Sequence, residues 1–112
     1  MKSTSKRASR RASLSLPELQ AEIARTFLKR DRRRGLMGTF GWFVEEVGEL
    51  STALREERPG SKAQAAEFAD CLAWLVSLAN LTGVDLDEAV RRKYAGGCSR
   101  CRRQPCQCRS KK

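Results

Sequence analysis

The sequence has no histidine among its 112 residues, and this absence excludes several kinds of chemistry at once. Ser-His-Asp and Cys-His nucleophilic catalysis, histidine general bases and His-ligated metal sites are all ruled out. Long hydrophobic runs are missing too, because the longest apolar stretch, 71–81, is too short to span a bilayer and contains Ser77 and Asn80. Residues 1–15 lack the apolar core of a signal peptide. We therefore expect a cytoplasmic protein with no membrane segment.

Acidic residues are absent from both ends of the chain, although the net charge is +10. Residues 1–15 and 91–112 carry Lys and Arg but no acid, so all 13 acids lie between them. Basic ends of this kind are usually solvated tails, and some of them bind nucleic acid. We expect a flexible basic tail over 1–14, with weak nucleic-acid contact through both tails, and we look for chemistry in the acidic middle.

Helical periodicity runs through this middle region, and no useful length of it alternates with the period of a strand. Ser15 and Ser61 each precede Glu or Gln by three residues, which is the pattern of a capping box, and Asp85 caps a last short helix. The sequence therefore predicts an all-α bundle of about four helices, over residues 15–30, 39–58, 62–82 and 85–94, with a loop at 31–38. In the second helix the predicted apolar stripe is Phe43, Val47, Leu50 and Leu54. A bundle of about 80 residues buries little surface, so we expect a homodimer or homotetramer.

Two pairs of carboxylates occupy the second and third predicted helices. Glu46 and Glu49 are three residues apart, and so are Glu67 and Asp70, which places each pair on one helix face. The Pro59-Gly60 turn predicts antiparallel helices, so the two pairs can face each other. Facing carboxylates repel, and a divalent cation with oxygen ligands, Mg²⁺ or Mn²⁺, removes that penalty. The alternative is a set of solvated acids on two amphipathic helices.

The paired motif resembles that of the MazG-like nucleotide pyrophosphohydrolases, which are all-α enzymes. It consists of EExxE at 45–49 and ExxD at 67–70, and the segments VGELSTALRE, EFADCLAWL and GVDLDEAVRRKY are similar to that family as well. The resemblance covers about residues 15–94. It implies an enzyme that cleaves a nucleoside triphosphate between the α and β phosphates, giving a monophosphate and pyrophosphate. It also implies that Mg²⁺ is held by four acids, namely Glu46, Glu49, Glu67 and Asp70.

The same resemblance assigns roles to four further residues. Glu45 is the adjacent motif acid, a candidate for a second metal ion or for activating water. Trp74 is a candidate for stacking on the base, as is Trp42, although core or interface packing would explain either residue. Lys93 matches a lysine that reaches the substrate phosphates. The family often has Asn four residues later, where this chain has Gly97, so Arg91 or Arg92 is a possible substitute at that end.

The segment 95–112 has a different composition and is too short for a core of its own. Its cysteines follow the pattern C-x2-C-x4-C-x-C, at Cys98, Cys101, Cys106 and Cys108. Thiolates at this spacing can surround a tetrahedral Zn²⁺, and nearby arginines would offset the negative charge. The sequence thus predicts a structural zinc knuckle, with two disulfides or a free redox-sensitive tail as alternatives. Cys71 lies apart from this group and is interpreted as a small core residue.

Two functions of different classes remain open from the sequence. The first is an enzyme, a Mg²⁺-dependent nucleotide pyrophosphohydrolase that acts in nucleotide-pool housecleaning. The second is a binding module in which a zinc knuckle and basic tails on a helical bundle hold nucleic acid. The carboxylates favour the enzyme, because acids gathered at one point repel phosphate unless a metal intervenes.

Overall fold

The computed structural model describes residues 13–109, and within that range it is built from helices without any strand. The helices are α2 (Leu16–Arg34), α3 (Leu36–Glu56), α4 (Lys62–Thr82) and α5 (Leu86–Tyr94). The predicted all-α class is therefore confirmed. The basic tail predicted over 1–14 lies outside the described residues except for its last two positions.

Helix ends lie where the capping residues predicted them. At the start of α2 the backbone N–H of Glu18 donates to Ser15 Oγ at 3.2 Å, and the Ser15 N–H donates to Glu18 Oε1 at 2.8 Å. This is the reciprocal capping box, and it lowers the pKa of Glu18 through the two contacts with Ser15. Asp85 caps α5 by accepting from the Glu88 N–H at 3.1 Å. At the end of α4, Gly83 takes the left-handed conformation that stops a helix.

The junction between α2 and α3 differs from the prediction of a loop over residues 31–38. Helix α2 continues to Arg34, α3 begins at Leu36, and Gly35 alone separates them with a φ of 91°. The charged residues that suggested a loop are ordinary helix formers, and Arg34 pairs with Asp31 one turn earlier at 2.8 Å. Thr39 also stabilises the junction by donating to the Gly35 carbonyl at 2.8 Å. A positive φ at one glycine is enough to turn the chain.

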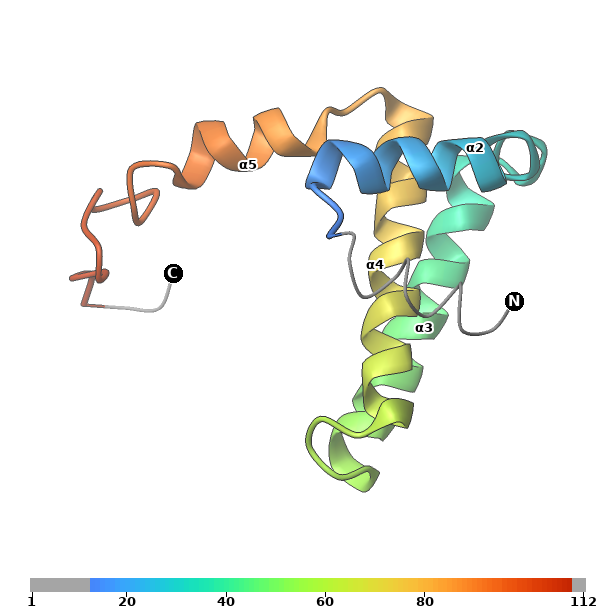
Figure 1. Ribbon diagram of the computed structural model, residues 1–112, viewed down its shortest axis with the longest axis horizontal. Helices are drawn as coiled ribbons and strands as arrows, with labels where there is room; N and C mark the ends of the chain where they lie inside the picture. The colour runs from blue at the N-terminus through green and yellow to red at the C-terminus, as the bar shows by residue number, and fades with distance from the viewer. Residues whose placement is uncertain (1–12, 110–112) are drawn as a thin grey trace.

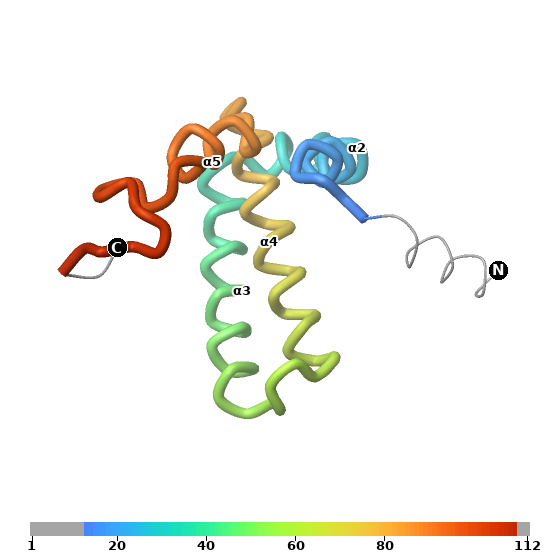
Figure 2. Tube along the Cα trace, turned by 60° about the vertical axis from the view of Figure 1, so that its left-hand side comes forward, coloured from blue at the N-terminus to red at the C-terminus, as the bar shows by residue number. Residues whose placement is uncertain are grey.

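Helices α3 and α4 form a long antiparallel hairpin, and α2 crosses its open end (Figure 1). At the closed end, half of the second predicted capping box forms, because Ser61 Oγ accepts from the Gln64 N–H at 3.2 Å, while the Gln64 side chain bonds elsewhere. Its amide oxygen accepts from the Gly60 N–H at 2.9 Å, and its amide nitrogen donates to the Ala53 carbonyl at 3.4 Å. Figure 2 shows α5 leaving the open end of the hairpin, followed by the cysteine-rich segment.

The stripe predicted for the second helix is partly wrong. Phe43 and Leu50 are half-buried as expected, whereas Val47 is 43% and Leu54 is 53% exposed. The line that faces α4 is instead formed by Thr39, Phe43, Glu46, Leu50 and Ala53, which are all buried or half-buried. The apolar stripe of α3 is thus wider than α4 alone can cover. Polar residues occupy part of the line that faces α4.

Large apolar side chains remain uncovered along one side of the hairpin, and we call them the apolar face. They are between 43% and 53% exposed: Leu36, Phe40, Val44, Val47 and Leu54 of α3, with Phe68, Leu72 and Leu75 of α4. Most of them come one residue after a side chain that faces the other helix. On both helices they therefore point about 100° around the axis from that inner line. In an antiparallel pair the same rotation puts both stripes on the same side.

Within the described residues, no single helix is long and apolar enough to cross a membrane. Helices α4 and α5 satisfy that requirement only together, as a pair bent by 101°.

Candidate active site

Three carboxylates from two helices converge on one point of the hairpin, and we call them the acidic cluster. Glu46 comes from α3, whereas Glu67 and Asp70 come from α4. One oxygen of each lies within 4.8 Å of the other two. The convergence follows from the sequence, because Glu67 and Asp70 share a helix face at a spacing of three residues and the hairpin places Glu46 opposite them.

Burial and mutual repulsion disfavour negative charge in the acidic cluster. The pKa of Glu46 is raised from its ordinary value by burial first, and then by the charges of Asp70, Glu67 and Glu49. Oxygen Oε1 of Glu67 is buried and has no hydrogen-bond partner. Oxygens gathered in this way without a compensating donor fit a hard divalent cation, since Mg²⁺ and Mn²⁺ take carboxylate oxygens as ligands.

The other two predicted acids, Glu45 and Glu49, lie beside the acidic cluster on α3 and are exposed. Glu49 is close enough for its charge to contribute to the raised pKa of Glu46. Glu45 precedes Glu46 by one residue, which rotates it by about 100° around the helix axis. The structure therefore brings three of the five motif acids together and leaves these two at the edge.

Trp42 and Trp74 stack on each other, each one turn away from an acid of the cluster. Their ring centroids are 6.2 Å apart, and the ring planes are inclined by 16°. The Arg34 guanidinium lies over the Trp74 ring, 4.9 Å from its centroid, in a cation–π arrangement. Trp42 is 48% exposed, so this aromatic pair is open to solvent on one side.

A pocket of about 190 Å³ lies between α2 and α4, next to the acidic cluster. Asp70 and Trp74 line it from α4, and Asp31 and Arg34 line it from α2. Neither α2 residue was predicted from the sequence, because both fall in the segment 31–38 that was expected to be a loop. The available signal was the spacing of an acid and an arginine by three residues, which is typical of a helical ion pair.

Comparison with known proteins places these features in one family. The MazG nucleotide pyrophosphohydrolase domain matches residues 37–101, which is more than half of the chain. The chain belongs to the MazG family. This MazG protein is also 43% identical over 83 residues to a protein of Cyanophage S-2L named dATP/dGTP diphosphohydrolase, across 72% of this chain and 71% of that protein. The predicted family and enzyme class are thus confirmed: the chain is a nucleotide pyrophosphohydrolase.

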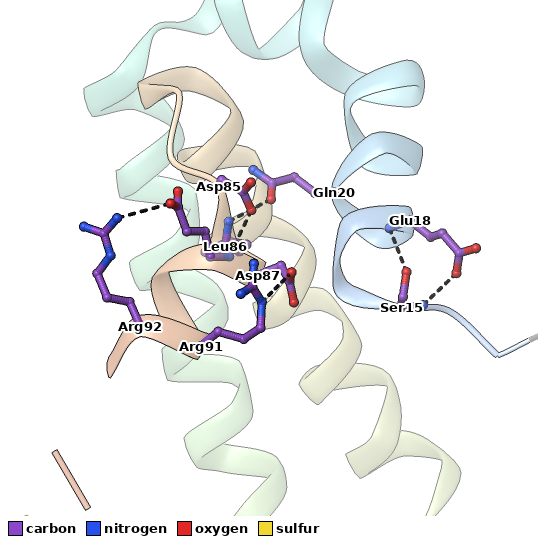
Figure 3. A network of polar contacts seen from close by, with 9 residues as sticks. Ser15, Glu18, Gln20, Asp85, Leu86, Asp87, Arg91 and Arg92 are labelled. Atoms are coloured by element: carbon purple, nitrogen blue, oxygen red, sulfur yellow. Dashed lines mark hydrogen bonds and ion pairs between the residues drawn. The ribbon is translucent and has the colours of Figure 1, made fainter. Parts of the chain in front are cut away.

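In this MazG protein, Lys93 lies apart from the pocket. It is exposed near the end of α5, and its Nζ is 5.7 Å from the centroid of the Tyr94 ring. Arg91 and Arg92, the candidate substitutes for phosphate contact, pair with Asp87 at 3.0 Å and with Glu88 at 3.2 Å (Figure 3). Within one chain, the structure does not bring these three cations to the acidic cluster.

Gln20 of α2 fixes the start of α5. Its side-chain oxygen accepts from the Leu86 N–H at 3.0 Å (Figure 3), and its side-chain nitrogen donates to the Val84 carbonyl at 2.6 Å. The direction in which α5 leaves the MazG hairpin is therefore set by a side chain of α2.

The four cysteines that follow α5 form a second group, the thiol cluster, made of Cys98, Cys101, Cys106 and Cys108. Their sulfurs all lie within 4.8 Å of one another, and all four cysteines are free. Gly97 supplies the tight turn before them with a φ of 96°. A Cβ at Gly97 would come within 2.8 Å of the Arg103 carbonyl oxygen, so only glycine fits there.

Backbone N–H groups are directed at the sulfurs of the thiol cluster. Contacts from the N–H groups of Cys101 and Arg100 lower the pKa of Cys98 to about 6, whereas neighbouring thiols, Cys106 first, raise the pKa of Cys108 to about 12. Four thiols at this distance cannot all ionise without a cation between them. The donor set fits a thiolate-bound metal ion, because deprotonated cysteine is the form that binds metals.

Proposed function

We propose that this protein hydrolyses nucleoside triphosphates between the α and β phosphates, with purine deoxynucleotides as its main substrates, and releases a monophosphate and pyrophosphate. The observation that carries the proposal is the acidic cluster beside a pocket lined by Trp74. The name of the cyanophage relative supports purine deoxynucleotides in particular. Such a reaction would serve nucleotide-pool housecleaning in the cytoplasm.

The acidic cluster, with Glu49 as a fourth acid, would hold Mg²⁺ or Mn²⁺. When bound there, the ion would neutralise phosphate charge and supply an acidified water as the nucleophile. The buried oxygen of Glu67 would then gain the partner that it lacks. Glu45, which is exposed beside the cluster, is our candidate for accepting a proton from the attacking water.

The aromatic pair is proposed to bind the base. Trp74 lines the pocket, and Trp42, which stacks on it, extends the aromatic surface toward solvent. Lys93 is proposed to contact the phosphates. Because α5 leads away from the hairpin, a second subunit would have to bring this lysine to the acidic cluster.

The experiment is hydrolysis of each common NTP and dNTP, with and without Mg²⁺, followed by separation of monophosphate and pyrophosphate. Asp70→Asn and Glu49→Gln should each lower turnover by about 1,000-fold or more, because each removes charge stabilisation of the transition state. Glu56→Gln, at an exposed acid of the same helix as Glu49, is the matched control and should keep full activity. Full activity in EDTA, or in both site variants, would contradict the proposal.

We also propose that the thiol cluster holds a structural Zn²⁺. Four sulfurs from one short segment would occupy all the positions of a tetrahedral ion, which leaves none for water or substrate. This assignment makes 95–112 a zinc knuckle appended to the helical domain 15–94. Weak contact between its arginines and nucleic acid stays a prediction.

We propose, finally, that the apolar face is covered by a second copy of the chain, in a homodimer or homotetramer. The eight side chains of this face lie on both helices of the hairpin, and α2 packs against the other side of α4. An apolar surface of this extent is typical of a subunit interface.

A further inference from the structure

Asp31 is the most deeply buried acid in the described part of the chain, and half of its carboxylate has no partner. Its exposure is 2%. Oxygen Oδ1 accepts a hydrogen bond from Arg34 at 2.8 Å, whereas Oδ2 is buried without any hydrogen bond. A buried acceptor that lacks a donor destabilises a protein, so an arrangement of this kind fits a group that a ligand completes.

The surroundings of Asp31 hold its carboxylate in one position. Arg34 also donates to Thr39 Oγ1 at 3.3 Å, and its guanidinium lies over Trp74. Thr39 is fully buried and is itself fixed by its bond to the Gly35 carbonyl. The carboxylate is therefore oriented in advance by a chain of contacts that extends from α2 to α3 and α4, which is what selective recognition requires.

The pocket that Asp31 lines also contains Asp70, which belongs to the acidic cluster. Trp74 lines the same pocket as these two acids, and Phe27 adds an apolar side chain from α2. A nucleotide with its phosphates at the acidic cluster would thus direct its base toward Trp74 and Asp31. Enzymes read a base by stacking on its ring and by hydrogen bonds to its Watson–Crick edge, and this pocket provides a group for each.

We propose that Asp31 determines base specificity by accepting hydrogen bonds from the Watson–Crick edge of guanine; this inference rests on the proposed function above. Guanine presents two adjacent N–H donors, at N1 and at the 2-amino group, which match one carboxylate. Adenine and cytosine place a ring acceptor beside their amino group, and thymine flanks its single N–H with two carbonyls. An ionised carboxylate repels those acceptors, so guanine is the base that pairs best with Asp31.

The test compares kcat/KM for dGTP, dITP, 1-methyl-dGTP and dATP in the wild type and in Asp31→Asn. The asparagine keeps an oxygen for Arg34 and has nearly the same shape, but it lacks the charge and can present an N–H to the pocket. The wild type should prefer dGTP. Its kcat/KM should be about 10-fold lower for dITP and on the order of 100-fold lower for 1-methyl-dGTP. In Asp31→Asn the preference for dGTP over dATP should fall by on the order of 100-fold.

A second readout separates recognition from folding and from hydrolysis. Titration of the metal-free protein with dGMP and with dAMP, followed by tryptophan fluorescence, should show tighter dGMP binding in the wild type and not in Asp31→Asn. Thermal unfolding of the variant shows whether the pocket persists. The role of Asp31 would be overturned if Asp31→Asn lowered kcat/KM equally for all nucleotides. It would also be overturned if the wild type hydrolysed 1-methyl-dGTP as fast as dGTP. A wild type that hydrolyses no nucleotide but still binds dGMP selectively would refute the proposed function alone.

Discussion

Glu46 is the residue at which stability and function make opposite demands. The proposed metal site would need its carboxylate charged, whereas burial and the neighbouring acids favour the neutral form, and its pKa is raised accordingly. A raised pKa means that the folded protein binds this proton more tightly than the unfolded chain does. The charge on Glu46 therefore lowers the stability of the metal-free protein at pH values above the raised pKa, and this penalty disappears as the pH falls toward 4.5.

We predict that Glu46→Gln stabilises the metal-free protein at pH 7 while it removes the pyrophosphohydrolase activity. The expected rise in melting temperature, measured in EDTA, is roughly 2–4 °C, because the charge penalty is relieved in a half-exposed site. The gain should shrink as the pH is lowered toward 4.5. Added Mg²⁺ should raise the melting temperature of the wild type more than that of the variant.

Glu56→Gln, which changes an exposed acid of the same helix, should show none of these effects. If Glu46→Gln instead lowers the melting temperature in EDTA, the glutamate is stabilising as it stands and the view of a strained acidic cluster is wrong.

The acidic cluster could be predicted from the sequence because its geometry is local. Glu67 and Asp70 share a helix face through their spacing alone, and one short turn brings Glu46 opposite. Asp31 could not be found in the same way, since its importance depends on α2 crossing the hairpin and on an oxygen left without a donor. Neither property has a signature in the order of residues.

At the scale of the helices, the ends were predictable and the junction was not. Ser15, Ser61 and Asp85 mark helix starts by short-range hydrogen bonds, which the sequence encodes directly. The run of arginines before Gly35 does not show where α2 ends, because arginine is compatible with either a helix or a loop. The apolar stripe of α3 was misplaced for a related reason: the sequence shows how many apolar residues the helix has, but not which of them its neighbour covers.

For the segment after α5 we predict one tightly bound Zn²⁺ per chain that survives gel filtration. Replacing Cys98 and Cys101 by Ser should abolish zinc binding, as measured by metal analysis, because two thiolates cannot close a tetrahedral site. The variant should be affected in stability or substrate binding more than in the chemical step, since the thiol cluster contains no acid of the proposed hydrolytic site.

Cys71→Ser is the matched control for zinc content, because Cys71 lies on α4 outside the thiol cluster. A purified protein without zinc, with four freely reactive tail thiols under reducing conditions, would rule out the knuckle. A double variant that bound nucleotide but turned over as slowly as Asp70→Asn would instead make the tail part of the catalytic machinery.

At the scale of the whole molecule, the apolar face exposes more large apolar side chains than the core buries. Only Ala53, Val76 and Ala79 are buried apolar residues in the described part of the chain, which is a small core for four helices. Covering the eight exposed side chains would give the hairpin a second interior. The stability of the fold and its association would then depend on the same contacts.

We predict that light scattering at micromolar concentration gives at least twice the chain mass of 12.6 kDa. Leu72→Glu should shift the protein to the monomer and lower its melting temperature, because it places a charge in the proposed interface. Val90→Glu, at an apolar side chain of α5 that is 47% exposed and outside the apolar face, should leave the mass unchanged. A mass of one chain for the wild type at every concentration would refute the assembly.

Gly35 joins the helix that carries Asp31 to the helix that carries Glu46. Because this joint is one residue long, the two helices have little freedom to move relative to each other. An extra residue that lengthened α2 or α3 by one position would turn that helix's side chains by about 100° and shift them by about 1.5 Å along its axis. The acidic cluster lies within the α3–α4 hairpin and would keep its shape, whereas the distance from Asp31 to the acidic cluster would change. We therefore expect an insertion at this joint to impair the proposed selectivity for the base and to leave the proposed hydrolytic site intact.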